Sequence, residues 1–142
     1  MSYWDTSALM PIFVDEATSA TMQAAYEQDP GPTTSWLTIV ECWSALARLV
    51  REGRVTLAGA EQTRAVIAAH ARAAREIAMT EALRVLAGQL LQRHPLRAAD
   101  SLHLAAALVW AENEPQGRDF VCLDTRLRDA AAREGFRVLP AG

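Results

Sequence analysis

The chain contains no lysine, and all 14 of its cationic residues are arginine. Chemistry that needs an amine side chain is therefore excluded, including the phosphate-binding lysine of P-loop proteins and Schiff-base catalysis. Long apolar runs are also missing, because charged residues interrupt them well before the roughly 20 residues that a membrane-spanning helix needs. The amino terminus lacks the basic start and apolar core of a secretory signal. These absences predict a cytoplasmic protein without a membrane segment.

The chain also has few cysteines and no excess of positive charge. Cys42 and Cys122 each lie within an apolar stretch and lack the paired spacing of a zinc site. We therefore expect buried free thiols and no redox chemistry. The formal net charge of −3 argues against a protein that coats nucleic acid non-specifically, because such binding needs many phosphate contacts. A local arginine patch is compatible with this charge.

Length and pattern together predict the fold class. A chain of 142 residues has the size of one domain and buries roughly 70% of its unfolded surface. Short apolar runs alternate with helical patterns, as expected for a parallel sheet between helical layers. No repeat, low-complexity tract or linker divides the sequence. We expect a single α/β domain over residues 1–142, with a three-layer α/β/α architecture and a mainly parallel central sheet.

The individual elements follow from periodicity and breakers. Strands are expected at 2–4, 33–37, 77–79, 120–123 and 136–139. Helices are expected around Pro11, where the helix kinks or restarts, and at 15–27, 39–50, 57–75, 80–90, 96–112 and 126–134. No breaker separates the fourth helix from the fifth, so one long helix is the alternative there.

Four acidic residues stand just past apolar runs or at the entrance to helical ones: Asp5, Glu41, Asp100 and Asp124. In an open α/β sheet, such positions converge on the crevice beyond the carboxyl ends of the strands. Carboxylates crowded there repel one another unless a divalent cation neutralises them, and oxygen ligands suit Mg²⁺ or Mn²⁺. Such a cation can neutralise phosphate oxygens and present a water. The pattern therefore predicts a metal-dependent phosphodiesterase.

Each acid also has an ordinary structural role available. Asp5 and Asp124 precede predicted helices and suit N-caps, which is the better interpretation of either residue alone. Glu41 completes a capping box that begins at Thr38. Asp100 is harder to explain, because it lies within a helix rich in Ala and Leu, where an unpaired charge is costly. Capping gives no reason for four acids to share these placements, so a joint functional role is favoured.

Four motifs carry a resemblance to a known family. They are Asp5-Thr-Ser-Ala-Leu, Glu41 after the second strand, Leu96-Arg-Ala-Ala-Asp100-Ser-Leu-His, and Phe120-Val-Cys-Leu-Asp124 followed by Glu134-Gly-Phe-Arg-Val. In order and spacing the chain resembles a PIN domain, and more closely a VapC-type toxin of a type II toxin–antitoxin pair. The resemblance covers essentially the whole chain. It implies the α/β/α fold, Mg²⁺- or Mn²⁺-dependent endoribonuclease activity, homodimerisation and inhibition by a small VapB-type antitoxin.

Residue by residue, the resemblance implies roles for the four acids. Asp5 and Asp100 are expected as the primary metal ligands. Glu41 is expected as a ligand or as the carboxylate that orients the attacking water, and Asp124 as an outer or second-metal position. The family's polar positions beside the first and fourth acids correspond to Thr6, Ser7 and Thr125.

The expected substrate is a structured RNA, either tRNA or an rRNA loop. Two alternatives stay open: a binding or regulatory module whose acids are structural, and a DNA-directed nuclease of the same fold. The antitoxin is expected to lay a segment against the helix that bears Trp43, Leu46 and Val50 and to bring a basic side chain to the acids.

Other residues give weaker signals. His103 lies one helical turn from Asp100, and we interpret it as a packed or supporting residue, because a hard oxygen site gains little from imidazole. Two arginine clusters suit RNA phosphates, but interspersed glutamates favour a solvated face; they are Arg48, Arg51, Arg54 and Arg64, Arg72, Arg75. The tryptophans are interpreted as core or dimer contacts: Trp4, Trp36, Trp43 and Trp110.

Overall fold

Five short strands form one central sheet, as the alternating pattern predicts. A computed structural model describes residues 1–142 without a gap. The strands are β1 (Ser2–Trp4), β2 (Thr33–Ser35), β3 (Arg75–Ile77), β4 (Asp119–Val121) and β5 (Arg137–Leu139). Their order in the sheet is β3-β2-β1-β4-β5, and every neighbouring pair is parallel. The parallel α/β fold is therefore confirmed, and β1 lies at the centre of the sheet.

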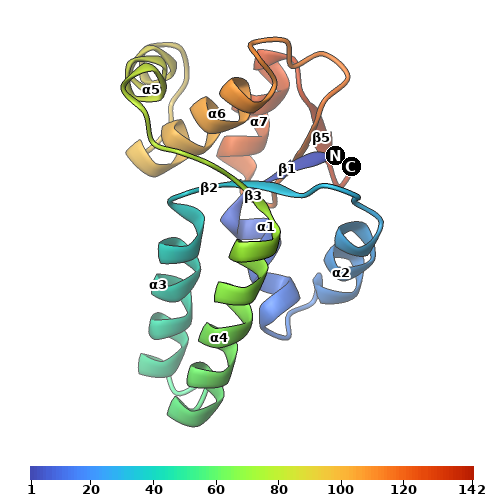
Figure 1. Cartoon of the computed structure of the whole chain (residues 1–142), viewed down its shortest axis with the longest axis vertical. Helices are drawn as coiled ribbons and strands as arrows, with labels where there is room; N and C mark the ends of the chain where they lie inside the picture. Colours follow the sequence, from blue (N-terminus) through green and yellow to red (C-terminus); the bar gives the residue numbers. More distant parts are fainter.

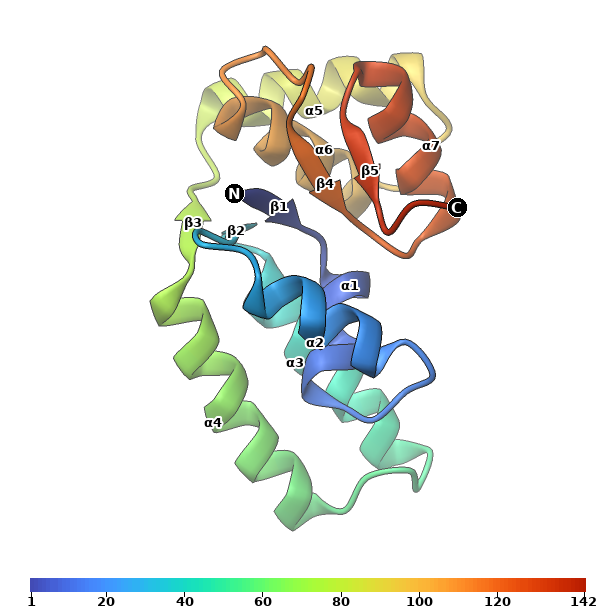
Figure 2. The same cartoon turned by 90° about the vertical axis from the view of Figure 1, so that its right-hand side faces the viewer.

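Seven helices connect the strands (Figures 1 and 2). They are α1 (Thr6–Phe13), α2 (Ser19–Glu27), α3 (Thr38–Arg51), α4 (Leu57–Ala73), α5 (Glu81–Arg93), α6 (Ala98–Trp110) and α7 (Thr125–Glu134). None of them has both the length and the hydropathy that crossing a membrane requires.

Two of the differences from the sequence-based prediction matter most for the architecture and the site. One continuous helix through α4 and α5 is wrong, because Ala74 adopts an extended conformation and the next three residues pair with β2 as strand β3, two residues earlier than predicted. Helix α6 begins at Ala98 and not at residue 96, because Arg97 is also extended and acts as the N-cap. The second difference changes the environment of Asp100, which falls in the first turn of the helix.

Helices cover both faces of the sheet and enclose two separate apolar cores. In Figure 1, α5, α6 and α7 lie above the sheet, and α1 to α4 lie below it. Strand β1 contributes to both cores, because successive side chains of a strand point to opposite faces. Tyr3 stacks on Phe120 in the upper core at 5.4 Å between ring centroids. Trp4 meets Tyr26 edge-on in the lower core at 5.1 Å.

The tryptophans do not share one environment. Trp4 and Trp110 are buried as predicted, and Trp43 is half-buried. Trp36 is 62% exposed, so its interpretation as a core residue is wrong. It follows the last residue of β2, and its backbone N–H still bonds to the Ile77 carbonyl at 2.9 Å.

Candidate active site

Asp5 lies directly beyond the carboxyl end of the central strand and is 5% exposed. Its backbone N–H bonds to the Val121 carbonyl at 3.0 Å, which ties it to β4. Its Oδ2 accepts hydrogen bonds from the Ser7 backbone N–H at 3.2 Å and from the Ser7 hydroxyl at 2.6 Å. The Cys122 thiol donates to the same oxygen at 3.4 Å. Asp5 therefore caps α1, as its structural interpretation predicts, and still presents its second oxygen to the interior of the site.

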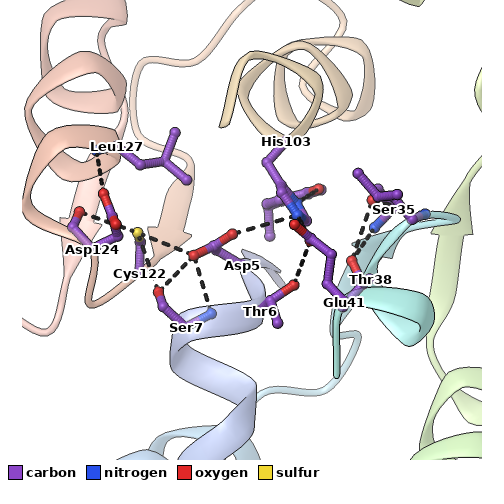
Figure 3. A network of polar contacts seen from close by, with 12 residues as sticks. Asp5, Thr6, Ser7, Ser35, Thr38, Glu41, His103, Cys122, Asp124 and Leu127 are labelled. Atoms are coloured by element: carbon purple, nitrogen blue, oxygen red, sulfur yellow. Dashed lines mark hydrogen bonds and ion pairs between the residues drawn. The ribbon is translucent and has the colours of Figure 1, made fainter. Parts of the chain in front are cut away.

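Glu41 lies in the first turn of α3 and points toward Asp5 (Figure 3). Its Oε1 accepts a hydrogen bond from the Thr6 hydroxyl at 2.7 Å and bonds to Nε2 of His103. The capping-box interpretation of Glu41 is wrong, because Thr38 Oγ1 accepts from the Ser35 backbone N–H instead. We call Asp5 and Glu41 the inner pair.

His103 links the two members of the inner pair. Its Nε2, already bonded to Glu41, lies 3.6 Å from Oδ1 of Asp5. Its Nδ1 forms a hydrogen bond with the Tyr3 hydroxyl at 2.9 Å. The ring is 1% exposed and bonded on both sides, so it cannot turn without breaking contacts. His103 is thus the packed, supporting residue that the sequence predicts, in contact with the acids.

The charges of this cluster are mutually supporting. Burial by itself lowers the pKa of His103, but the hydrogen bond to Glu41 and the charges of Asp5, Glu41 and Asp100 raise that pKa above its ordinary value. Burial likewise raises the pKa of Glu41, but the bonds from His103 and Thr6 bring it below its ordinary value. Both shifts favour the charged forms, so His103 and Glu41 stabilise each other's charge in a buried setting.

Asp100 and Asp124, which we call the outer pair, are held by backbone groups at helix starts. One oxygen of Asp100 accepts from the Arg97 N–H at 3.2 Å, and Oδ1 of Asp124 accepts from the Leu127 N–H at 3.0 Å. Asp100 is half-buried and Asp124 is exposed. Helix α6 is mostly buried, as expected, and Asp100 is less buried than most of the helix because it lies in the first turn.

The outer pair lines an open cavity of ≈ 490 Å³. Six polar residues and no apolar residue line it: Arg97, Asp100, Asp124, Thr125, Arg126 and Asp129. Burial and the charges of Asp124 and Asp5 raise the pKa of Asp100, and this effect exceeds the opposing influence of Arg97. The outer pair and Asp5 are thus close enough to repel one another. Thr125 borders this cavity, whereas Thr6 and Ser7 bond directly to the inner pair.

The four acids gather at one edge of the sheet as two pairs and not as one closed ring. No three of the chain's His, Cys, Asp and Glu side chains converge on a single ion-sized point. The donors are nevertheless chemically suited to a hard divalent cation, because they are carboxylate oxygens whose mutual repulsion such an ion relieves. The free thiols Cys42 and Cys122 are both buried, and burial raises the pKa of each of them.

Two contributors to this network were not predicted from the sequence. Tyr3 supports His103 from inside the sheet, and Cys122 donates to Asp5. A signal for Tyr3 was available, because a residue two positions before Asp5 on a strand points to the same face of the sheet. His103, by contrast, was identified from the sequence, because it lies three residues from Asp100 on a predicted helix.

Comparisons with known proteins agree with this architecture. The PIN domain family matches residues 2–133. Ribonuclease VapC45 and ribonuclease VapC49, from two strains of Mycobacterium tuberculosis, are each 34% identical to the chain over 142 residues, covering 98% of the chain and 94% of the relative.

Two solved structures share the fold. The crystal structure of M. tuberculosis VapC20, a sarcin–ricin loop cleaving toxin, aligns with a TM-score of 0.68 at 19% identity, covering 96% of this chain and 97% of that one. A toxin–antitoxin complex from Klebsiella pneumoniae aligns with a TM-score of 0.61 at 17% identity, covering 89% and 88%. With 98% of its length matched by VapC ribonucleases and its four acids at the carboxyl edge of a parallel sheet, the chain belongs to the PIN-domain family, in the VapC group.

Proposed function

We propose that this protein is a metal-dependent endoribonuclease of the toxin type. The observation that carries the proposal is the gathering of Asp5, Glu41, Asp100 and Asp124 at one sheet edge, where the pKa of Asp100 is raised by burial and by neighbouring carboxylates. The names of the 34% identical relatives, both ribonucleases, support RNA as the substrate. The target is a structured RNA, a tRNA or an rRNA loop, and the protein acts in the cytoplasm, where such RNA is found.

Asp5 and Asp100 would hold Mg²⁺ or Mn²⁺, with Glu41 as a further ligand or as the carboxylate that orients water, and Asp124 farther out. When bound, such an ion neutralises phosphate oxygens and lowers the pKa of a water. Ser7 fixes one oxygen of Asp5 and leaves the other free. Glu41 bonds to protein donors through Oε1 and Asp100 through Oδ2, so the second oxygen of each would be available to the ion.

The chain's own residues prepare the site for hydrolysis. Thr6 and His103 hold the Glu41 carboxylate, so a water bonded to this group is oriented before substrate arrives. No ribose hydroxyl takes part when water attacks the phosphorus. The products therefore carry a 5′-phosphate and a 3′-hydroxyl.

An apolar groove between α3 and α4 suits the antitoxin. It encloses ≈ 300 Å³, and its lining includes Trp43, Leu46 and Val50, the residues predicted to meet the partner. The Arg64 guanidinium covers the Trp43 ring at 4.4 Å. A VapB-type segment with an apolar face fits this groove, and the Klebsiella toxin–antitoxin complex of the same fold is consistent with such a partner.

A homodimer forms part of the proposal as well. Trp36 and Val40 are 62% and 50% exposed; Trp36 lies just before α3, and Val40 lies in its first turn. Contact between two copies through this face would cover both side chains. The molar mass in solution, measured by light scattering, tests it, and a Trp36→Ser variant that remains as large as the unmodified protein would count against this face.

Purified protein incubated with total RNA and Mn²⁺ tests the enzymatic proposal. Discrete fragments with 5′-phosphate ends are expected, and EDTA should abolish them. Asp129→Asn is a matched control, because Asp129 lines the same cavity as the outer pair and has no proposed role. The proposal fails if the folded protein leaves every RNA intact with Mg²⁺ and with Mn²⁺. A preference for a single-stranded DNA flap would favour the DNA-directed alternative.

A further inference from the structure

Two arginines line the cavity of the outer pair without pairing with any of its acids. Arg97 precedes α6, and Arg126 lies in the first turn of α7. Both side chains are exposed, and neither takes part in the ion pairs of the chain. Two free guanidinium groups therefore flank a cavity that contains two of the four acids.

Several other arginines already bond to protein groups. Arg54, Arg84, Arg93 and Arg137 each pair with a carboxylate. Arg128 donates to the carbonyls of Cys122 and Pro140 at 2.7 Å each. The two clusters suggested by the sequence are less suitable, because Arg64 stacks on Trp43 and Arg48 lines a different cavity that contains neither acid of the outer pair. Position and freedom together thus single out Arg97 and Arg126.

The chemistry of the cavity indicates an anion with several oxygens. A guanidinium group presents a planar fork of donors that matches phosphate bidentately. Helices α6 and α7 both begin at this cavity, and the partial positive charge of a helix amino terminus acts in the same direction. The three aspartates repel a phosphate, so the two arginines determine whether one is tolerated there.

We propose that Arg97 and Arg126 clamp a backbone phosphate of the RNA strand adjacent to the phosphate that is cleaved. This inference rests on the proposed ribonuclease function and adds to it the direction in which the strand leaves the acids, over the starts of α6 and α7. Phosphate contacts of this kind set the register of a nucleic acid without reading its sequence. Arg97 and Arg126 therefore position the substrate and act mainly on its binding.

Salt dependence of RNA binding tests the clamp directly. A Glu41→Gln parent, in which hydrolysis is slowed, is titrated with a fluorescently labelled single-stranded RNA at several salt concentrations. Each phosphate contact contributes about 0.7 to the slope of log K against log salt for a single strand. Arg97→Gln and Arg126→Gln should each lower that slope by about 0.7, and Arg97→Lys should restore it because the charge returns. Arg133→Gln, at the far end of α7, is the matched control and should leave the slope unchanged.

Kinetics give an independent measurement in the protein with Glu41 intact. Arg126→Gln should raise KM several-fold with little change in kcat, because the contact is remote from the reacting phosphate. If the parent binds RNA and the Arg97, Arg126 and Arg133 variants show equal slopes of log K against log salt, the clamp is overturned. A parent that binds no RNA, together with an unmodified protein that cleaves none, would overturn the ribonuclease proposal, and the clamp with it.

Discussion

The inner and outer pairs of acids hold the same kind of charge by different means. Asp5 and Glu41 both bond to side-chain hydroxyls, Asp5 in addition to the Ser7 N–H, and a buried imidazole joins them. Asp100 and Asp124 are fixed by backbone amides at the starts of two helices and face an open cavity. The inner pair is thus neutralised by the fold itself, whereas the outer pair retains its repulsion. Removing charge should therefore destabilise the first pair and relieve the second.

The largest expected effect is shared by both pairs and concerns catalysis. Asp5→Asn and Asp100→Asn should each slow RNA cleavage by on the order of 10³-fold, because losing an ion-binding carboxylate costs several kcal/mol of transition-state stabilisation. Single-turnover cleavage of a labelled RNA measures the loss. Asp129→Asn provides the control on the same cavity. Near-normal cleavage by either variant would remove that acid from the proposed site.

Stability should separate the two pairs where activity does not. Glu41→Gln removes the charged partner of the buried His103 ring and should cost about 2 kcal/mol of unfolding free energy. Asp100→Asn keeps an oxygen for the Arg97 N–H while removing a charge that its neighbours disfavour, so its stability should be equal or higher. Urea unfolding in EDTA measures both. An unfolded Asp100→Asn protein would show instead that Asp100 is a structural partner.

A smaller effect is expected at the support of the inner pair. Tyr3→Phe removes one hydroxyl and leaves Nδ1 of His103 without its bond to residue 3, at a cost of about 1–2 kcal/mol. Cleavage should fall less than in the Asp5 variant, because Glu41 keeps its bonds to His103 and Thr6. Unfolding and cleavage measured on one preparation check both statements. Unchanged stability would indicate that the ring is held by packing alone.

The smallest effect is a pH dependence with opposite signs for the two pairs. The pKa of Glu41 is lowered from 4.5 and that of His103 is raised from 6.5, so their mutual stabilisation is fully present between these values. It is lost as the pH falls through the folded pKa of Glu41 or rises through the folded pKa of His103. Asp100 has a raised pKa, so its destabilisation is present at higher pH and disappears as the pH falls toward 3.8.

Melting temperatures of metal-free protein across the pH range measure this dependence. The difference between the unmodified protein and Glu41→Gln should be widest near pH 5 to 6, within the window set by the two ordinary pKa values, and should narrow in alkaline buffer. The difference between the unmodified protein and Asp100→Asn should narrow in acid. A gap for Glu41→Gln that is the same at every pH would argue against a charged imidazole.

The sequence predicted the parallel α/β fold and PIN-domain membership because both depend on local periodicity and on the order of short motifs. It placed the start of α6 two residues early, since Leu96 and Arg97 are compatible with a helix and only the fold shows that Arg97 is extended. The expectations that Asp100 lies near the other acids and on a mostly buried helix were right, and its place in the partly exposed first turn was missed.

The links within the inner pair could not be predicted locally. Glu41 and His103 are 62 residues apart, and Tyr3 and His103 are 100 residues apart. Such contacts depend on how α3 and α6 pack around β1, and packing of that kind leaves no short-range pattern in the chain. The spacing of Asp100 and His103 on one helix was the strongest local indication, and it identified the residue without identifying its partners.

Helix α3 joins two tasks in one rigid body. Its first turn carries Glu41, and the groove proposed for the antitoxin begins at Trp43 and continues to Arg51, all within a helix about 21 Å long. A heritable change that closes the groove by repacking α3 would also shift Glu41 and weaken cleavage. Escape from the inhibitor and retention of toxicity are thus opposed within one helix, which favours joint evolution of the two partners over release of the toxin by a single substitution.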